Sequence, residues 1–186
     1  YNSKRLIQAW GIASTVESRA STVEEALTIA REIGYPVVLK IDAEDILHKT
    51  EAGALVLNIR DDEGLRRAYS QIITNAKNYA PLAKIHGVVV QETVTALEEV
   101  IIGVKRDAQL GPVIIFGSGG TLVVLAGDVA IRVCPIHSLD AEEMVSEAKV
   151  GRLLRGYRGK RRGDMSSLID ILVNVSDLAM NLSNCI

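Results

Sequence analysis

Two basic side chains in the first third of the sequence have the types and spacing needed to handle phosphate. Lys40 lies near the end of a short apolar run at residues 37–41. An ammonium group in such a run must reach water or meet an anion, because an unpaired buried charge is costly. His48 follows along the chain, with Lys49 beside it and Gly53 after it. Imidazole can attack a phosphoryl group and release it again, so these residues indicate a phosphate-handling site with a movable loop. A histidine without a chemical role stays an alternative.

A glycine-rich segment follows another apolar run at residues 112–116. It contains Gly117, Gly119 and Gly120. Glycines let backbone N–H groups approach an anion, or permit a turn with positive φ. The segment lacks the Gly-Lys-Ser/Thr ending of a Walker loop and the glycine spacing of a dinucleotide-binding turn. By itself it is equally compatible with a hairpin turn.

Polar side chains also stand at the ends of two further apolar runs. Gln91 and Glu92 end the run at residues 87–92, and Glu98 and Glu99 precede the next run. Carboxylates beside a cleft suit ribose hydroxyls or a metal ion, and the alternative is a solvated hairpin.

The isolated arginine and the basic loop are further candidates. Arg132 is the single charged residue of the run at residues 129–133, and a strand arginine that faces a cleft needs an anionic partner. Five basic residues crowd into residues 155–162, where they could bind RNA or phosphate, or form a solvated loop. Aromatic residues make up 4% of the chain, so platforms for base stacking are scarce.

Composition narrows the class of protein. The chain has 186 residues, 48% of them hydrophobic and 24% charged, with a net charge of −2. These values suit one compact domain or two small lobes, and they give no electrostatic reason to expect nucleic acid or an anionic membrane as a partner. No apolar run approaches the roughly 20 residues that span a bilayer. Cys134 and Cys185 are the only cysteines, so we expect a reducing cytoplasm and no zinc site.

Hydrophobic periodicity predicts the elements that must position these side chains. Strands are expected at residues 12–17, 37–41, 55–59, 87–92, 99–104, 112–116 and 129–133, and helices at 4–10, 23–33, 62–78, 140–150 and 164–182. Expected helix caps are the capping box Thr22–Glu25, Asp61 or Asp62, Asp140 and Asp164. Alternating strands and helices give way to a strand-rich half near residues 80–87, so the pattern predicts an α/β (α+β) fold with lobes at 1–84 and 85–186.

Taken in order, the segments resemble the ATP-grasp domain of the ADP-forming (NDP-forming) acyl-CoA synthetases. This family includes the acetate–CoA ligase and pimeloyl-CoA synthetase type and is distantly related to succinyl-CoA synthetase. The resemblance covers nearly the whole chain. It is carried by residues 34–40, 46–53, 87–91, 99–103, 107–112, 116–120 and 153–159, and by Arg132, Pro135, Asp164 and Ser176.

The resemblance implies an ATP-grasp fold, in which a nucleotide lies in a cleft between two α/β lobes. Lys40 would contact the nucleotide phosphates, Gln91 would lie near the adenine, and Glu99 would lie on the nucleotide side of the cleft. The segment with Gly117, Gly119 and Gly120 would face the phosphates, with Arg132 nearby.

His48 would belong to a mobile loop that passes phosphate between distant sites. The implied reaction is acyl-CoA + ADP + phosphate = acid + CoA + ATP, through phosphohistidine and with Mg²⁺ on the phosphate oxygens. The implied partners are the CoA-binding and ligase domains, or a subunit, of the same oligomeric enzyme. As one domain, the chain is expected to be inactive alone.

The chain departs from the family pattern. Val124 stands where the family usually has a glutamate and Gly127 where it usually has a lysine or a similar residue, and the acidic strand that supplies metal ligands is expected after Ile186. An alternative is therefore a non-catalytic, regulatory ATP-grasp module of a larger protein acetyltransferase. A third is a ligase that joins a carboxylate to an amine, and RNA binding by residues 155–162 is a fourth.

Overall fold

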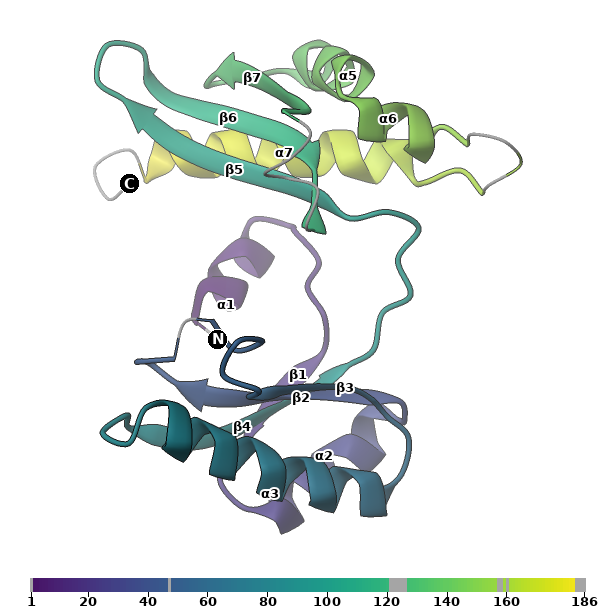
Figure 1. The fold of residues 1–186 in the computed structure, drawn as a ribbon. Helices are drawn as coiled ribbons and strands as arrows, with labels where there is room; N and C mark the ends of the chain where they lie inside the picture. The colour runs from purple at the N-terminus through teal and green to yellow at the C-terminus, as the bar shows by residue number, and fades with distance from the viewer. Residues whose placement is uncertain (1, 47, 121–126, 157–158, 160, 183–186) are drawn as a thin grey trace. The chain divides into compact units, whose positions relative to one another are not determined.

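The computed structural model describes residues 2–46, 48–120, 127–156, 159 and 161–182. Val124 and part of the basic segment 155–162 lie outside these residues. The chain forms two compact units, Thr15–Thr95 and Tyr1–Ser14 with Ala96–Ile186 (Figure 1). Each unit combines an antiparallel sheet with helices, which confirms the predicted α/β (α+β) class. No helix in the described part of the chain is long and apolar enough to cross a bilayer.

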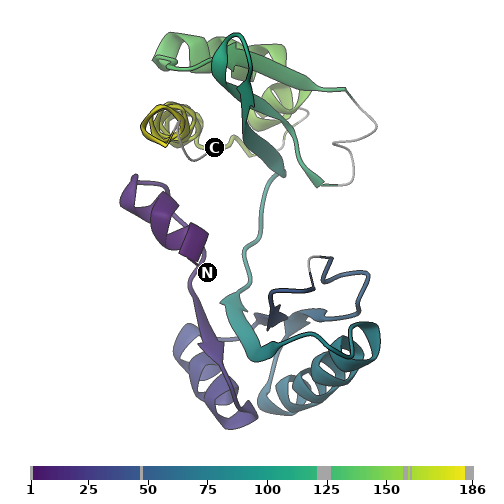
Figure 2. The ribbon, with the colours of Figure 1, turned by 90° about the vertical axis from the view of Figure 1, so that its left-hand side faces the viewer.

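The Thr15–Thr95 unit is a four-stranded antiparallel sheet with strand order β1-β4-β2-β3. Its elements are β1 (Glu17–Ala20), α2 (Val23–Ile33), β2 (Val37–Ala43), β3 (Leu55–Ile59), α3 (Asp62–Tyr79) and β4 (Ile85–Glu92). Figure 2 shows α2 and α3 side by side on one face of this sheet. That arrangement leaves the other face of the sheet without helices from this unit.

The core of this unit lies between the sheet and its two helices. Successive side chains of a strand point to opposite faces, and Leu39 and Ile41 of β2 point toward the helices with Val88 and Val90 of β4. All four are almost fully buried, and they pack with apolar residues of both helices. Burying one such side chain stabilises the fold by about 1.5–3 kcal/mol. The intervening residues of both strands are therefore free to carry polar groups.

The predicted strand at residues 12–17 is wrong in its position, because β1 spans Glu17–Ala20. Pairing explains the shift. β1 adds to the edge of β4 with Ala20 opposite Val88, and Ala20 is buried in the core. The apolar residues before Glu17 favoured an earlier strand, but contact with the buried centre of β4 decides where β1 forms.

The compact units differ from the expected lobes 1–84 and 85–186. β4 begins at Ile85 and is hydrogen-bonded between β1 and β2, so it belongs to the Thr15–Thr95 unit. Its pairing with the two strands makes it a central strand of this sheet. A domain boundary placed just before β4 would separate this strand from β1 and β2, to which it is hydrogen-bonded.

The second unit is a three-stranded antiparallel sheet, β5-β6-β7, with helices. Its elements are α1 (Asn2–Ala9), β5 (Val100–Asp107), β6 (Gly111–Ser118), β7 (Val129–Val133), α5 (Ser138–Glu147), α6 (Lys149–Leu154) and α7 (Met165–Asn181). Ile114 and Phe116 of β6 are fully buried and pack with Met144 of α5 and Leu172 of α7. The helices thus cover the sheet face to which these β6 side chains point.

The helix predicted at residues 140–150 is two helices in the structure. α5 ends before Ala148, whose extended backbone (φ −71°, ψ 137°) breaks the helix before α6 begins. Asp140 is wrong as the N-cap, because α5 begins earlier and the Asp140 carboxylate accepts the His137 N–H at 2.8 Å. Asp164 is confirmed as the N-cap of α7, since its carboxylate accepts the Ser167 N–H at 3.0 Å.

One of the two hydrogen bonds of the predicted capping box at the start of α2 is confirmed. The Thr22 hydroxyl accepts the Glu25 N–H at 3.2 Å, as an N-cap should. The Glu25 carboxylate reaches one residue further back and accepts the Ser21 N–H at 2.7 Å.

Candidate functional site

Lys40 lies on the face of its sheet that is opposite α2 and α3. Its Nζ donates one hydrogen bond to Oε2 of Glu17 and another to Oε1 of Gln91, each at 2.8 Å. We call these three residues the lysine cluster. The sequence singled out Lys40 and Gln91 but not Glu17. The charge that compensates Lys40 in this structure is therefore a carboxylate that sequence reasoning missed.

The register of the sheet brings the lysine cluster together. Gln91 of β4 lies opposite Glu17 on one side and opposite Val38 on the other, and Lys40 is two residues beyond Val38. Directly opposed residues share a face, and so do residues two apart on one strand. Three strands thus deliver three polar side chains to one place without any loop.

Burial strengthens the ion pair within the lysine cluster. The Glu17 side chain is 6% exposed and the Lys40 side chain 23%. A carboxylate so covered needs a compensating charge, and the Lys40 ammonium provides it. An ammonium group has three N–H donors, and two of them go to Glu17 and Gln91. The geometry leaves one donor for an incoming anion.

A second ion pair lies on the same sheet face. Nε of Arg19 is 2.9 Å from Oδ2 of Asp42. The register places Arg19 two residues after Glu17, and Asp42 two residues after Lys40. Positive and negative groups therefore alternate across this face.

His48 lies in the segment between β2 and β3, which we call the histidine segment (residues 46–54). Its side chain is exposed. From His48 onward, two backbone hydrogen bonds hold the segment: the His48 carbonyl accepts the Ala52 N–H at 3.1 Å, and the Ala54 carbonyl accepts the Ile41 N–H at 2.9 Å. Ile46, Ala52 and Ala54 are buried in the core. The imidazole is thus displayed by a segment anchored on both sides.

Gly53, which follows His48 in the segment predicted to be a movable loop, is held to α3. Its carbonyl accepts a hydrogen bond from Nδ2 of Asn75 at 2.8 Å, and its φ of +58° is a conformation that favours glycine. A Cβ atom added to Gly53 would lie 2.8 Å from that same Asn75 nitrogen. Glycine at this position therefore permits both the turn and the tether to Asn75.

The glycine segment (residues 117–120) belongs to the other unit and ends β6. The Gly119 N–H donates to the Glu99 carbonyl at 2.7 Å. A Cβ on Gly119 would lie 2.8 Å from the Glu99 carbonyl carbon, and one on Gly120 would lie 2.6 Å from Oε2 of Glu99. The close approach of the Glu99 backbone thus requires glycine at position 119, and the φ of +65° favours glycine at position 120.

A pocket of about 250 Å³ opens beside the glycine segment. It is lined by Glu98, Glu99, Ser118, Gly119, Gly120, Val150 and Leu153. Carboxylates and a hydroxyl on one side and two apolar side chains on the other suit a ligand with both polar and apolar parts. Three of the predicted site residues therefore meet in one concavity of this unit.

Asp128 supports the glycine segment from behind. Its carboxylate accepts hydrogen bonds from the Ser118 hydroxyl at 2.7 Å, the Lys149 N–H at 2.6 Å and the Val150 N–H at 3.2 Å. Burial raises the pKa of Asp128, but these hydrogen bonds outweigh burial and hold that pKa below its ordinary value. Asp128 thus links β6 to the first turn of α6, a role that the sequence did not reveal.

Arg132 has its anionic partners within its own unit. Its guanidinium forms an ion pair with Glu147 and lies 3.5 Å from Oε2 of Glu143, both on α5. The pairing raises the pKa of Arg132 and lowers that of Glu147. Arg132 lies opposite the buried Ile114, so it belongs to the sheet face that the helices cover. The expectation of an anionic partner is met by glutamates of the protein.

The predicted site residues are divided between the two units. Lys40, His48 and Gln91 belong to Thr15–Thr95. Glu99, the three glycines of the glycine segment and Arg132 belong to the other unit. The sequence contains no signal for Glu17 or Asp128, because each acts through a strand pairing or a helix end more than twenty positions away.

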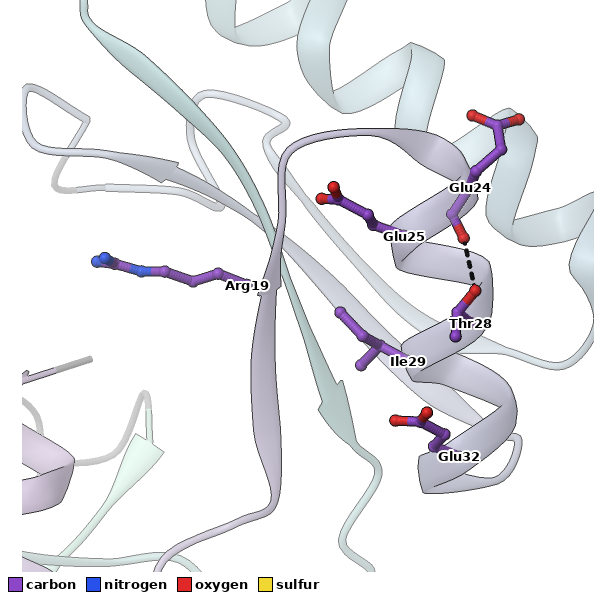
Figure 3. A pocket seen from close by; sticks show the side chains of 6 residues that line it. All are labelled: Arg19, Glu24, Glu25, Thr28, Ile29 and Glu32. Carbon is purple, nitrogen blue, oxygen red and sulfur yellow. Dashed lines mark hydrogen bonds between the residues drawn. The ribbon is translucent and has the colours of Figure 1, made fainter.

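Another hollow of about 410 Å³ lies between β1 and α2, and Figure 3 shows it from close by. Glu24, Glu25 and Glu32 line it with Arg19, Thr28 and Ile29. The Arg19 side chain extends away from α2 in this view, and its guanidinium pairs with Asp42. Two of the three glutamates are engaged elsewhere too, since Glu24 pairs with Arg66 and Glu25 with the Ser21 N–H. We therefore place no site in this hollow.

The described residues hold no group of three or more His, Cys, Asp or Glu side chains that could bind a metal ion. Mg²⁺ favours one or two carboxylates together with substrate phosphates. The Glu98 and Glu99 carboxylates at the pocket by the glycine segment fit that more modest requirement.

Comparison with known proteins assigns the chain to a family. A model of the ATP-grasp domain matches residues 1–185, so the chain belongs to the ATP-grasp domain family. It is 40% identical over its whole length to the beta subunit of acetate–CoA ligase [ADP-forming] II of Pyrococcus furiosus and covers 79% of that subunit. It is 42% identical over 95% of its length to acetate–CoA ligase [ADP-forming] I of Archaeoglobus fulgidus, of which it covers 26%.

Solved structures agree with this assignment. A dinucleotide-forming acetyl-coenzyme A synthetase 1 of Ca. Korarchaeum cryptofilum, in complex with coenzyme A and Ca-AMPCP, superposes with a TM-score of 0.92 at 41% identity, covering 96% of this chain and 78% of that one. A second structure of that synthetase holds coenzyme A and Mg-AMPPCP, with a phosphohistidine segment pointing towards the nucleotide-binding site (TM-score 0.81, 38% identity, 95% of this chain and 76% of that one). The predicted ATP-grasp fold is confirmed.

Proposed function

We propose that this chain is the nucleotide-binding, phosphoryl-transfer domain of an ADP-forming acyl-CoA synthetase. The observation that carries the proposal is the lysine cluster, in an ATP-grasp domain that resembles the beta subunit of such ligases. It places one ammonium donor on a sheet face with no helix of its own unit over it. The exposed His48 imidazole in the same unit supplies a group that can carry phosphate.

Different residues of the chain have different roles in binding the nucleotide. Lys40 binds the terminal phosphates of the nucleotide, and Gln91, which orients Lys40, lies toward the adenine. The glycine segment cradles phosphate oxygens and Glu99 faces the nucleotide, whereas Arg132 is paired with Glu147 and Glu143 on the helix-covered face and acts in holding α5 on β7. Glu98 and Glu99 are the residues that could hold Mg²⁺ together with the nucleotide phosphates, and the ion would supply positive charge to the phosphate oxygens.

The chemical step takes place between His48 and ADP. The terminal oxygen of ADP attacks the phosphoryl group on His48 while the other ring nitrogen of the phosphohistidine carries a proton. The N–P bond breaks and its electron pair returns to the ring nitrogen as the new O–P bond forms, so that neutral imidazole and ATP result. The reverse step recharges the histidine from ATP. Lys40 stabilises the charge that spreads over the equatorial oxygens during transfer. The complete reaction, acyl-CoA + ADP + phosphate = acid + CoA + ATP, uses CoA-binding and ligase domains or a subunit that joins this domain in an oligomeric cytoplasmic enzyme.

The named relatives favour this proposal over the regulatory alternative. They are ligases and synthetases, and none of those reported above is an acetyltransferase. The exposed His48 and the buried pairing of Lys40 also fit a phosphate-handling role.

Thermal unfolding with and without Mg-ATP or Mg-ADP tests the proposal. We expect both nucleotides to raise the melting temperature of the chain, and Lys40→Met to abolish most of that rise, because a ligand that binds only the folded state stabilises it. The matched control is Lys77→Met, which removes an exposed lysine from α3 of the same unit. Equal nucleotide shifts in the wild type and Lys40→Met would refute the role of Lys40.

A further inference from the structure

The proposed function does not account for Glu17. Its carboxylate is almost fully buried and lies 2.8 Å from the ammonium group that is proposed to bind phosphate. A carboxylate beside a phosphate-binding lysine is at first sight counterproductive, because it repels the ligand. Its position therefore calls for a function of its own.

We infer that Glu17 is a positioning residue that holds the Lys40 ammonium in place and limits how tightly it binds nucleotide phosphate. This inference rests on the proposed function, in which Lys40 meets the phosphates. Glu17 touches Lys40 and acts through it, so it is distinct from the residues that contact the nucleotide.

The positioning part follows from the sheet. Lysine has a flexible four-carbon stem, and a lone lysine on a sheet face would sample several rotamers. In the lysine cluster, the carboxylate of β1 and the amide of β4 fix Nζ from two directions at 2.8 Å each. Both acceptors are held by strand pairing, so the remaining N–H donor is aimed before any ligand arrives.

The limiting part follows from charge and distance. Two partners at 2.8 Å from one tetrahedral nitrogen are about 4.5 Å apart. A phosphate oxygen on the third donor of Lys40 would thus meet the Glu17 carboxylate at about that distance. Even at the dielectric constant of water, two unit negative charges this close repel each other enough to weaken binding about fivefold. Partial burial of the cluster makes the effect larger.

Glu17→Gln separates the two parts. Glutamine has the same shape and keeps an oxygen that can accept from Lys40, and Gln91 continues to hold Nζ. The substitution therefore removes the negative charge and retains most of the positioning. We expect the variant to bind Mg-ATP at least about fivefold more tightly than the wild type. A residue with a purely structural role would weaken binding when changed.

Isothermal titration of the purified chain with Mg-ATP and with adenosine tests the inference. Adenosine carries no phosphate, so its affinity should be the same in the wild type and Glu17→Gln. The matched control is Glu24→Gln, which removes one negative charge from an exposed position at the start of α2, and it should leave Mg-ATP affinity unchanged. Unchanged or weaker Mg-ATP binding by Glu17→Gln overturns the inference.

Two further variants distinguish failure of the inference from failure of the proposed function. If the wild type binds no Mg-ATP, or Lys40→Met binds it as well as the wild type does, the proposed function fails and the inference falls with it. If Lys40→Met weakens binding but Glu17→Gln does not tighten it, the inference alone fails. Independently of nucleotide, Lys40→Met should lower the melting temperature less in a Glu17→Gln background, because the buried negative charge that the Lys40 ammonium compensates is then absent. Equal losses in both backgrounds would show that Glu17 does not hold Lys40.

Discussion

Replacing Asp128 tests the physical reasoning about the glycine segment. The Asp128 carboxylate receives three hydrogen bonds, from the Ser118 hydroxyl and from the N–H groups of Lys149 and Val150. Asp128 is 8% exposed, so water cannot replace these bonds easily. Asp128→Ala would leave two backbone N–H groups at the start of α6 without their acceptor.

The magnitude follows from the kind of bond that is lost. A hydrogen bond to a charged group contributes about 1.5–3 kcal/mol, and a buried donor left unsatisfied costs a similar amount. Because the three bonds share one carboxylate, their effects do not add, and we expect Asp128→Ala to lower the free energy of unfolding by about 3–5 kcal/mol. Asp128→Asn keeps one acceptor oxygen and should lower it by about 1–2 kcal/mol.

Urea unfolding followed by tryptophan fluorescence measures this loss. Trp10 is the only tryptophan of the chain and belongs to the same compact unit as Asp128, so it reports on the right part of the molecule. Asp170→Asn, at an exposed position of α7, is the matched control. If Asp128→Asn and Asp170→Asn had the same unfolding midpoint, the account of Asp128 as a buried anchor would be refuted.

Asp128→Asn should also change how the free energy of unfolding depends on pH. The pKa of Asp128 is lower in the folded chain than its ordinary value of 3.8. A carboxyl group with a depressed folded pKa contributes stability that is present above its unfolded pKa and is lost as the pH falls through the folded pKa. The wild type should therefore lose stability below about pH 4 more steeply than Asp128→Asn.

Three other perturbations have defined outcomes. Gly151→Ala should destabilise the fold by about 3 kcal/mol in thermal denaturation, because the added Cβ would lie 1.7 Å from the Val145 carbonyl oxygen, and wild-type stability would contradict the described packing of α5 on α6. His48→Gln should leave the melting temperature unchanged, because the side chain is exposed, but should abolish acid-labile phosphate on the chain when the partner domains and Mg-ATP are supplied; phosphate that persisted would place the carrier elsewhere. Burial and a hydrogen bond to Asp62 raise the pKa of Tyr35 to about 12, so an ultraviolet titration should show a late tyrosine transition that Asp62→Asn moves to lower pH. Because this folded pKa lies above the ordinary 10.0, the stability due to Tyr35 should be complete below about pH 10 and lost as the pH rises toward 12.

Local signals in the sequence were sufficient for most elements. α2 begins after Thr22 and ends before Gly34, as its capping residues predict. The continuous apolar character of residues 37–41 predicts a strand, and β2 contains all of it. β1 was misplaced because its position depends on pairing with β4, a contact between residues about seventy positions apart. The break between α5 and α6 was missed because it rests on the backbone of a single residue, Ala148.

The candidate site was predictable where residue type alone carries the signal. A lysine in an apolar strand and a run of glycines after another strand can both be recognised without a structure. Glu17 and Asp128 could not be recognised, because each is one carboxylate among 23 acidic residues until folding buries it against its partners. The partners of Arg132 were missed for the same reason, since they lie one helical turn apart on α5, a helix whose start was placed wrongly.

The anchoring of the histidine segment limits the travel of its imidazole. An extended chain advances at most about 3.5 Å per residue, and His48 is two residues from the buried Ile46, so its Cα stays within about 7 Å of the Ile46 Cα while that anchor holds. A larger displacement of the His48 Cα requires Ile46 or Ala52 to leave the core and the hydrogen bond between Asn75 and Gly53 to break. Withdrawing one buried isoleucine costs about 1.5–3 kcal/mol. The rate at which such a histidine moves between phosphate sites would be set by apolar and amide side chains that do not contact phosphate. Substitutions at those positions would change that rate.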